Sequence, residues 1–164
     1  MALISSFTAR RLADRKPPAT RQIITFKAGS EWLAISTEIA QKVVPIQTIY
    51  QDQESLYLPT TYENKEVYLL DLTTHLMEEK KQQDLDIKKG YLILLETPQK
   101  TLTAVLLSAA PVLRRITEVA FVPIGLVHPI PKNIETISRF AIQVKDERLI
   151  FLLDYNCLIQ IAIQ

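Results

Sequence analysis

Hydrophobic runs alternate with short polar turns along most of the chain. Two of these runs are nearly the same, since residues 67–72 read VYLLDL and residues 150–155 read IFLLDY. Each follows a polar turn and leads into a short stretch with helical character. Apolar runs bounded by polar turns are typical of β-strands. The pattern therefore predicts a strand, an Asp and a short helix, built twice.

A hairpin is expected upstream of each copy. Residues 22–35 hold two apolar runs around a Gly29-Ser30 turn, and residues 91–106 hold two around a Pro98-Gln99-Lys100 turn. Two such runs separated by a few turn-forming residues are typical of a β-hairpin. Both halves of the chain are therefore expected to begin with a hairpin and to end in the LLD strand with its helix.

The segment that follows the first hairpin is expected to hold a helix and then a strand. Ser36 or Thr37 can cap a short helix that runs to Lys42, because a hydroxyl oxygen accepts the free N–H groups of a first helical turn. Residues 43–49 have the composition of a strand.

Turn signals and prolines set the remaining expectations. Residues 56–62 and 66–72 should form a hairpin, with Asn64 at a turn position that needs a left-handed backbone. Residues 77–88 are polar and of mixed charge, so the boundary between the halves is expected there. Prolines recur through residues 110–137, which should therefore form short strands and loops.

Two strands are apolar on both faces. The runs at 91–95 and 149–153 have apolar residues at consecutive positions, and successive strand residues point to opposite faces. An isolated barrel covers only one of these faces. Two small barrels packed together would provide a core inside each and a third between them. We therefore expect a mainly β fold of two fused subdomains, about residues 21–85 and 86–164, and leave open whether they exchange terminal segments.

Composition fits a folded domain and narrows its setting. The chain has 164 residues, of which 48% are hydrophobic and 23% charged, as in ordinary globular proteins. Its formal net charge is +1, so no nucleic-acid partner is expected. The apolar stretches are far shorter than the ~20 residues that span a bilayer. No transmembrane segment is therefore expected. Cys157 is the one cysteine, so an intramolecular disulfide is excluded and a cytoplasmic protein is expected.

Residues 1–20 are expected to form a flexible basic arm. Its basic residues are Arg10, Arg11, Arg15 and Lys16. The Pro17-Pro18 pair disfavours a continuous helix. The apolar residues Leu3, Ile4, Phe7 and Leu12 beside these charges leave open a tether to phosphates or anionic lipid, which would show a steep salt dependence. A solvated tail is the simpler interpretation.

Candidate catalytic groups are few, and each has a structural explanation. Asp71 and Asp154 follow strands and precede short helical stretches, where Asp is a preferred N-cap. His75 and His128 lack the spacing of a metal site, and Cys157 has no base beside it in the sequence. The chain has no glycine-rich phosphate loop. We therefore expect no enzyme and no cofactor, and recognition of a partner instead.

The order of elements resembles the CheW-like domain family, the coupling proteins of bacterial chemotaxis, over residues 22–164. The opening hairpin at 21–35 is similar to the family's first hairpin, and residues 138–154 are similar to its closing one. Gln41 stands where the family usually has Glu. The resemblance implies two SH3-like five-stranded β-barrels with short helices and a non-catalytic scaffold.

The same resemblance implies partners and a departure from the usual way of binding them. The implied partners are the regulatory domain of a histidine kinase and the signalling tip of a methyl-accepting-type receptor, in a two-component pathway for chemotaxis or pilus motility. The family's N-x-R-G turn falls on residues 61–64, where Glu63 replaces the Arg. A carboxylate cannot grip the acceptors that a guanidinium does, so a partner with a basic patch is expected.

Partner contact is expected at two places, the segment of residues 39–45 and the hairpin turn at residues 61–65. The expected contact residues are Ile39, Gln41, Val43, Pro45, Thr61, Tyr62, Glu63, Asn64 and Lys65. An ordinary hairpin tip is the alternative for the turn. For the whole chain, the alternative is a β-barrel that binds a small ligand in the crevice between the barrels.

Overall fold

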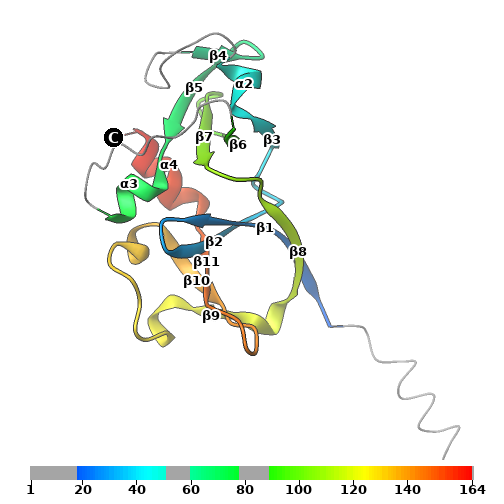
Figure 1. Cartoon of the computed structure of the whole chain (residues 1–164), viewed down its shortest axis with the longest axis vertical. Helices are drawn as coiled ribbons and strands as arrows, with labels where there is room; N and C mark the ends of the chain where they lie inside the picture. Colours follow the sequence, from blue (N-terminus) through cyan, green and yellow to red (C-terminus); the bar gives the residue numbers. More distant parts are fainter. Residues whose placement is uncertain (1–17, 51–59, 78–88, 164) are drawn as a thin grey trace, which may run out of the picture.

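The computed structural model describes residues 18–50, 60–77 and 89–163 (Figure 1). The strands are β1 (Thr20–Ala28), β2 (Glu31–Ser36), β3 (Lys42–Pro45), β4 (Thr60–Tyr62), β5 (Lys65–Leu70), β6 (Tyr91–Glu96), β7 (Leu102–Leu107), β8 (Val112–Thr117), β9 (Phe121–Pro123), β10 (Ser138–Ile142) and β11 (Ile150–Leu153). The helices are α2 (Ile46–Ile49), α3 (Leu72–Met77), α4 (Tyr155–Ile163) and the 3₁₀ turns η1 (Glu118–Ala120), η2 (Ile124–Leu126) and η3 (Ile134–Thr136).

The strands form two sheets, and the mainly β fold with two β subdomains and short helices is confirmed. Among the described residues, sheet A has six strands in the order β8-β1-β2-β11-β10-β9, and sheet B has five in the order β3-β6-β7-β5-β4. The sixth strand of sheet A is the three-residue β9. Within the described residues, no helix is long and apolar enough to cross a membrane.

Each sheet takes its central hairpin from the other half of the chain. The first hairpin, β1-β2, pairs with β8 and β11 in sheet A. The second hairpin, β6-β7, pairs with β3 and β5 in sheet B. The two LLD strands occupy equivalent places, since β5 runs parallel to β7 and β11 runs parallel to β2. The repeat seen in the sequence therefore builds two similar sheets that exchange hairpins.

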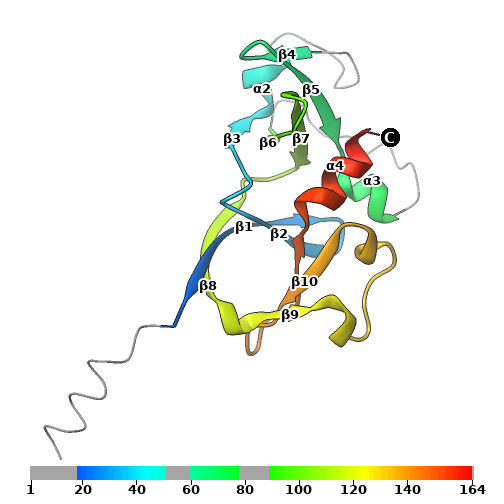
Figure 2. The same cartoon turned by 180° about the vertical axis from the view of Figure 1, so that it is seen from behind.

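Three hydrophobic clusters fill the space that this arrangement creates, as predicted from the two-faced strands. One lies inside sheet B around Ile46 and Leu92, and one inside sheet A around Ile23 and Ile142. The largest joins both sheets. It includes Ile24, Phe26, Leu33 and Ile35 of sheet A, Leu70, Ile93, Leu95, Val105 and Leu107 of sheet B, and Leu72 and Leu158 of the helices. Figure 2 shows α3 and α4 at the level between the two sheets.

The expected helix from Ser36 or Thr37 to Lys42 is wrong, because only one turn forms. The N–H groups of Ile39 and Ala40 donate to the Ser36 carbonyl at 3.1 and 3.2 Å. The next N–H, that of Gln41, donates instead to the Leu94 carbonyl of β6 at 2.8 Å. Pairing with β6 therefore ends the turn and starts β3.

The expected strand at 43–49 is correct only in its first part, because β3 ends at Pro45 and α2 follows. Proline has no N–H to continue a ladder. The Ile46 N–H donates to the Gly90 carbonyl at 3.0 Å. A Cβ on Gly90 would lie 2.3 Å from Ile46 Cδ1 and 2.8 Å from the Leu107 carbonyl oxygen. Glycine at position 90 therefore allows α2 to pack directly on β6.

The other segments follow the sequence pattern. Residues 110–137 form short strands and 3₁₀ turns as predicted. The expected hairpin at 56–72 is present as β4 and β5, and its residues 56–59 lie outside the described residues. The connector at 77–88 and the arm also lie outside them, except for Met77 and residues 18–20, where β1 already begins at Thr20.

Candidate partner-binding surface

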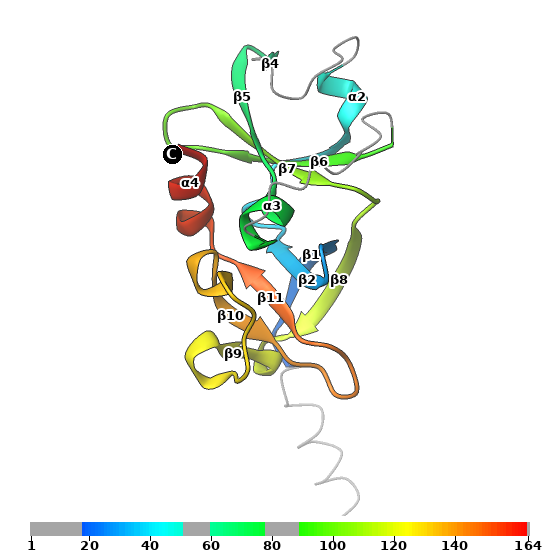
Figure 3. The ribbon, with the colours of Figure 1, turned by 60° about the vertical axis from the view of Figure 1, so that its left-hand side comes forward.

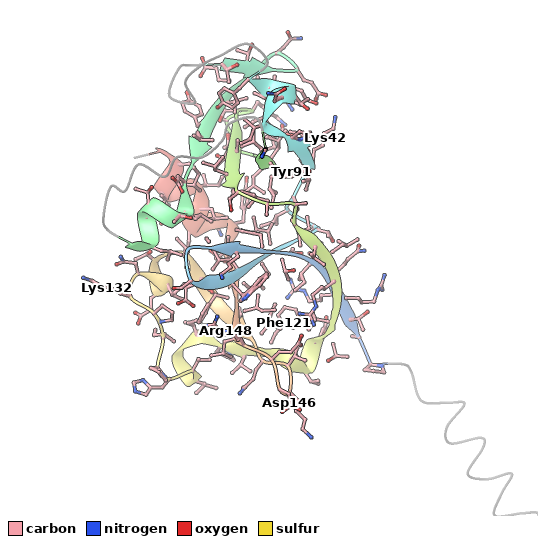
Figure 4. The ribbon with its side chains drawn as sticks, viewed as in Figure 1. Lys42, Tyr91, Phe121, Lys132, Asp146 and Arg148 are labelled. Atoms are coloured by element: carbon pink, nitrogen blue, oxygen red, sulfur yellow. The ribbon has the colours of Figure 1, made fainter. Side chains whose placement is uncertain are left out.

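The two edge strands of sheet B meet, and this brings the two expected contact segments together. The Nζ atom of Lys42, on β3, lies 3.0 Å from the hydroxyl oxygen of Tyr62, on β4. It also lies 5.5 Å from the centre of the Tyr62 ring and 3.9 Å from Glu63 Oε1. Sheet B is therefore curled until β3 and β4 touch at one end. Figure 4 shows Lys42 at this edge.

Most of the expected contact residues are exposed around this junction, which we call the sheet B edge surface. It consists of Gln41, Lys42, Val43 and Pro45 on the β3 side and Thr61, Tyr62, Glu63 and Asn64 on the turn side. Tyr62 is half-buried and the others are exposed. Two expected residues are placed elsewhere. Ile39 packs against the central core, and the Lys65 ammonium lies 3.4 Å from Glu96 Oε1.

The β4–β5 turn holds its side chains outward by its backbone conformation. Glu63 has φ 51° and Asn64 has φ 64°. Positive φ at both central residues is the requirement of the tight hairpin turn that matches strand twist. Asn tolerates this region, as expected for Asn64, whereas Glu seldom adopts it. The turn therefore presents the Glu63 carboxylate, whose side chain is 63% exposed, 3.9 Å from the Lys42 ammonium.

The charges of the surface are loosely compensated. The hydrogen bond to the Tyr62 hydroxyl raises the pKa of the Lys42 ammonium. The Lys42–Glu63 pair is solvent-exposed and 3.9 Å long, and such pairs contribute little to stability. Both charges remain available to a partner that carries complementary groups.

Lys42 was not among the expected contact residues, although it lies between two of them, Gln41 and Val43. Gln41, just before β3, and Val43 and Pro45 within it are exposed. Lys42 shares the opposite face with Val44, which is 4% exposed and lies in the core of sheet B. From this face of β3, the Lys42 side chain reaches the Tyr62 hydroxyl. The available signal was a lysine at the first position of the strand, on the same face as the buried Val44.

Asp71 and Asp154 are helix caps, as predicted. Asp71 Oδ1 accepts the N–H groups of Thr73 and Thr74 at 3.1 and 3.4 Å. Asp154 Oδ2 accepts the N–H of Cys157 at 3.1 Å. Each carboxylate thus satisfies N–H groups in the first turn of α3 or α4.

Replacing Asp71 by Ala should lower the free energy of unfolding by about 1 kcal/mol, since the N–H groups of α3 lose their acceptor. Asp71→Asn keeps an acceptor oxygen and should have a much smaller effect. Urea denaturation measures both. An equal loss in the two variants would mean that the negative charge, and not the cap, stabilises this site.

In the part of the chain that the structure describes, the remaining candidate groups show no reactive arrangement. Burial raises the pKa of the half-buried Cys157 thiol, which favours the unreactive protonated form. His75 Nε2 lies 2.8 Å from Thr136 Oγ1, a contact that ties α3 to η3. Among the described residues, no group of three or more His, Cys, Asp or Glu could hold a metal ion.

The alternative function predicts a small ligand in the crevice between the subdomains. In the described residues, the hydrophobic cluster that joins the two sheets fills this space. An open depression of about 520 Å³ lies instead among the loops of sheet A. It is lined by Ile124, Gly125, Val127, His128, Pro129, Ile130 and Glu135. This depression is away from the sheet B edge surface.

Comparison with known proteins places this geometry in context. The family model described as CheW-like domain matches residues 22–162. Among solved structures, the chain is similar to the scaffolding protein TtCheW from Thermoanaerobacter tengcongensis, with a TM-score of 0.60 and 16% sequence identity. That alignment covers 83% of this chain and 90% of the other. No curated protein sequence matches the chain.

Proposed function

Because the chain belongs to the CheW-like domain family, we propose that it is a non-catalytic adaptor that couples a chemoreceptor to a histidine kinase. Its partners are then the regulatory domain of the kinase and the signalling tip of a methyl-accepting-type receptor. It would act in the cytoplasm, in a chemotaxis-type or pilus-motility pathway.

The observation that carries this proposal is the sheet B edge surface. An aromatic ring, an ammonium group and a carboxylate meet where β3 and β4 touch. Val43 adds an apolar side chain that is 37% exposed. Tyr is one of the residue types enriched among the few that dominate binding energy in a protein interface, and charged groups such as Lys42 and Glu63 are typical of the polar rim around them.

The position of Glu63 supports a partner with a basic patch. Asn64, with φ 64°, occupies the place of the Gly in the family's N-x-R-G turn, and a left-handed conformation is what such a Gly provides. This agreement supports aligning Glu63 with the family's Arg. The carboxylate lies on the exposed turn, where it can meet a lysine or arginine of the partner.

Calorimetric titration of the purified chain with the regulatory domain of a chemotaxis-type histidine kinase tests the kinase side of the proposal. We expect saturable binding with one-to-one stoichiometry. Absence of heat and of complex formation with every such kinase domain of the same cell would contradict it.

Reversal of the Glu63 charge should weaken binding selectively. For Glu63→Arg we expect a loss of about 1–3 kcal/mol in binding free energy, because the new guanidinium faces the partner's basic groups. Glu135→Arg makes the same charge change in η3, away from the sheet B edge surface, and should leave the affinity unchanged. Calorimetry on both variants measures the difference. Equal affinities for the Glu63 and Glu135 variants would move the interface away from the turn.

A further inference from the structure

Sheet A carries an exposed apolar strip along its last strand, which we call the β9 edge strip. It consists of Val119, Pro123, Leu126 and Phe140. Val119 is 87% exposed, Leu126 78% and Phe140 43%. Phe140 lies opposite Pro123 in the β9–β10 register. Within the described residues, β9 pairs only with β10, so it is an edge of the sheet.

A β-bulge contributes to this exposure. The register of β10 against β11 shifts between Ser138 and Phe140. Ser138 is 1% exposed, and its Oγ lies 2.9 Å from the Phe140 carbonyl and 2.7 Å from the Leu152 carbonyl. After it, both Arg139 and Phe140 are exposed, before Ala141 returns to the core. Bulges re-aim side chains at sheet edges, so an outward Phe140 is built into the strand.

The amino-terminal arm enters the described chain beside this strip. The Glu118 N–H donates to the Ala19 carbonyl at 2.9 Å, and Val119 is the next residue. The Arg21 guanidinium carbon lies 5.0 Å from the centre of the Phe121 ring, at the first residue of β9. Figure 3 shows the start of β1 at the same end of the molecule as β9, and Figure 4 marks Phe121 there.

The composition of the arm complements the β9 edge strip and the carboxylates near it. Its apolar residues are Leu3, Ile4, Phe7 and Leu12, and its basic residues are Arg10, Arg11, Arg15 and Lys16. Exposed carboxylates lie near the strip. Glu118 precedes Val119, and Glu135 lines the same depression as Gly125, the residue before Leu126. The 17 residues before position 18 can span up to about 55 Å when extended. The strip is therefore within reach of the arm's apolar residues.

We propose that residues 1–17 dock across the β9 edge strip of their own chain. Exposed apolar sheet edges favour association with other chains, and proteins commonly cover them with a neighbouring segment. A short tether gives an effective concentration in the millimolar range, so a weak contact is enough to hold the arm. A protein that binds this edge of sheet A would then have to displace the arm first.

Limited proteolysis of the full-length chain tests the docking. Trypsin can cut the arm after Arg10, Arg11 and Arg15, and a docked arm is cut more slowly. In Leu126→Ser and Phe140→Ser we expect arm cleavage at least about threefold faster than in the parent chain, because the tethered contact is lost. Tyr68→Ser, which removes a side chain 48% exposed on β5, is the control and should leave the rate unchanged. Equal rates in all variants would overturn the proposal.

A disulfide measurement separates docking on the same chain from docking on a second copy. In a Cys157→Ser background, Phe7→Cys is combined with Leu126→Cys or, as a control, with Gln99→Cys in the β6–β7 turn of sheet B. We expect the first pair to form an intramolecular disulfide faster under mild oxidation, at a rate that does not depend on protein concentration. Equal rates for the two pairs, or disulfides between chains, would overturn it and leave the strip to another partner.

Discussion

Fragments 1–85 and 86–164 should each fail to fold alone and should form one folded complex when mixed in equal amounts. The first fragment would lack β6 and β7, which lie between β3 and β5 in sheet B. The second would lack β1 and β2, which lie between β8 and β11 in sheet A. Each fragment would therefore expose apolar strands on both faces. Together they can rebuild both sheets and the cluster between them.

Circular dichroism during urea titration measures this result. We expect no cooperative transition for either fragment and a cooperative transition for the mixture, with the intact chain as the reference. Sedimentation should report one copy of each fragment in the complex. A monomeric fragment that unfolds cooperatively without the other would contradict the exchange of hairpins.

Truncation of the LLD leucines should be the most destabilising of the single substitutions considered. Leu70 is 6% exposed and Leu153 3%, and both belong to the cluster that joins the sheets. We expect Leu70→Ala and Leu153→Ala each to lower the free energy of unfolding by about 2–5 kcal/mol, since each leaves a cavity in a packed core.

Urea denaturation of the intact chain gives these values. Leu126→Ala removes the same atoms from a side chain that is 78% exposed, and it should change stability by no more than about 0.5 kcal/mol. A loss below about 1 kcal/mol for both core variants would place the LLD side chains outside a tightly packed region.

Local features of the fold were predictable because their causes are local. The turn at Asn64 requires left-handed residues, and the caps at Asp71 and Asp154 require acceptors at the start of a helix. The third core was also predictable, since strands with apolar residues on both faces need cover on both. These features depend on neighbouring residues and on strand alternation alone.

The exchange of hairpins was not specified by the pattern. Both hairpins are apolar and similar in length, so either could pair with either LLD strand as far as periodicity shows. The choice depends on contacts between distant residues, such as Leu33 opposite Phe151 and Leu69 opposite Ala104. Likewise, α2 replaces an expected strand at 46–49 because Gly90 lets it pack on β6.

The candidate surface was predictable in its segments and not in its chemistry. The resemblance of residues 39–45 to a family segment pointed to the first segment, and the aromatic and charged turn at residues 61–65 pointed to the second. The contact of Lys42 with Tyr62 depends on closure of sheet B, which brings together its two edge strands.

The central claim is coupling, so the most direct measurement is assembly of three components. A receptor signalling-tip fragment and a kinase regulatory domain are mixed with and without the chain and analysed by sedimentation. The proposal predicts one complex that contains all three proteins and forms only when the chain is present. It also predicts less of this complex with Glu63→Arg than with Glu135→Arg. If the receptor fragment and the kinase domain never enter the same complex at saturating concentrations of the chain, the adaptor function is contradicted.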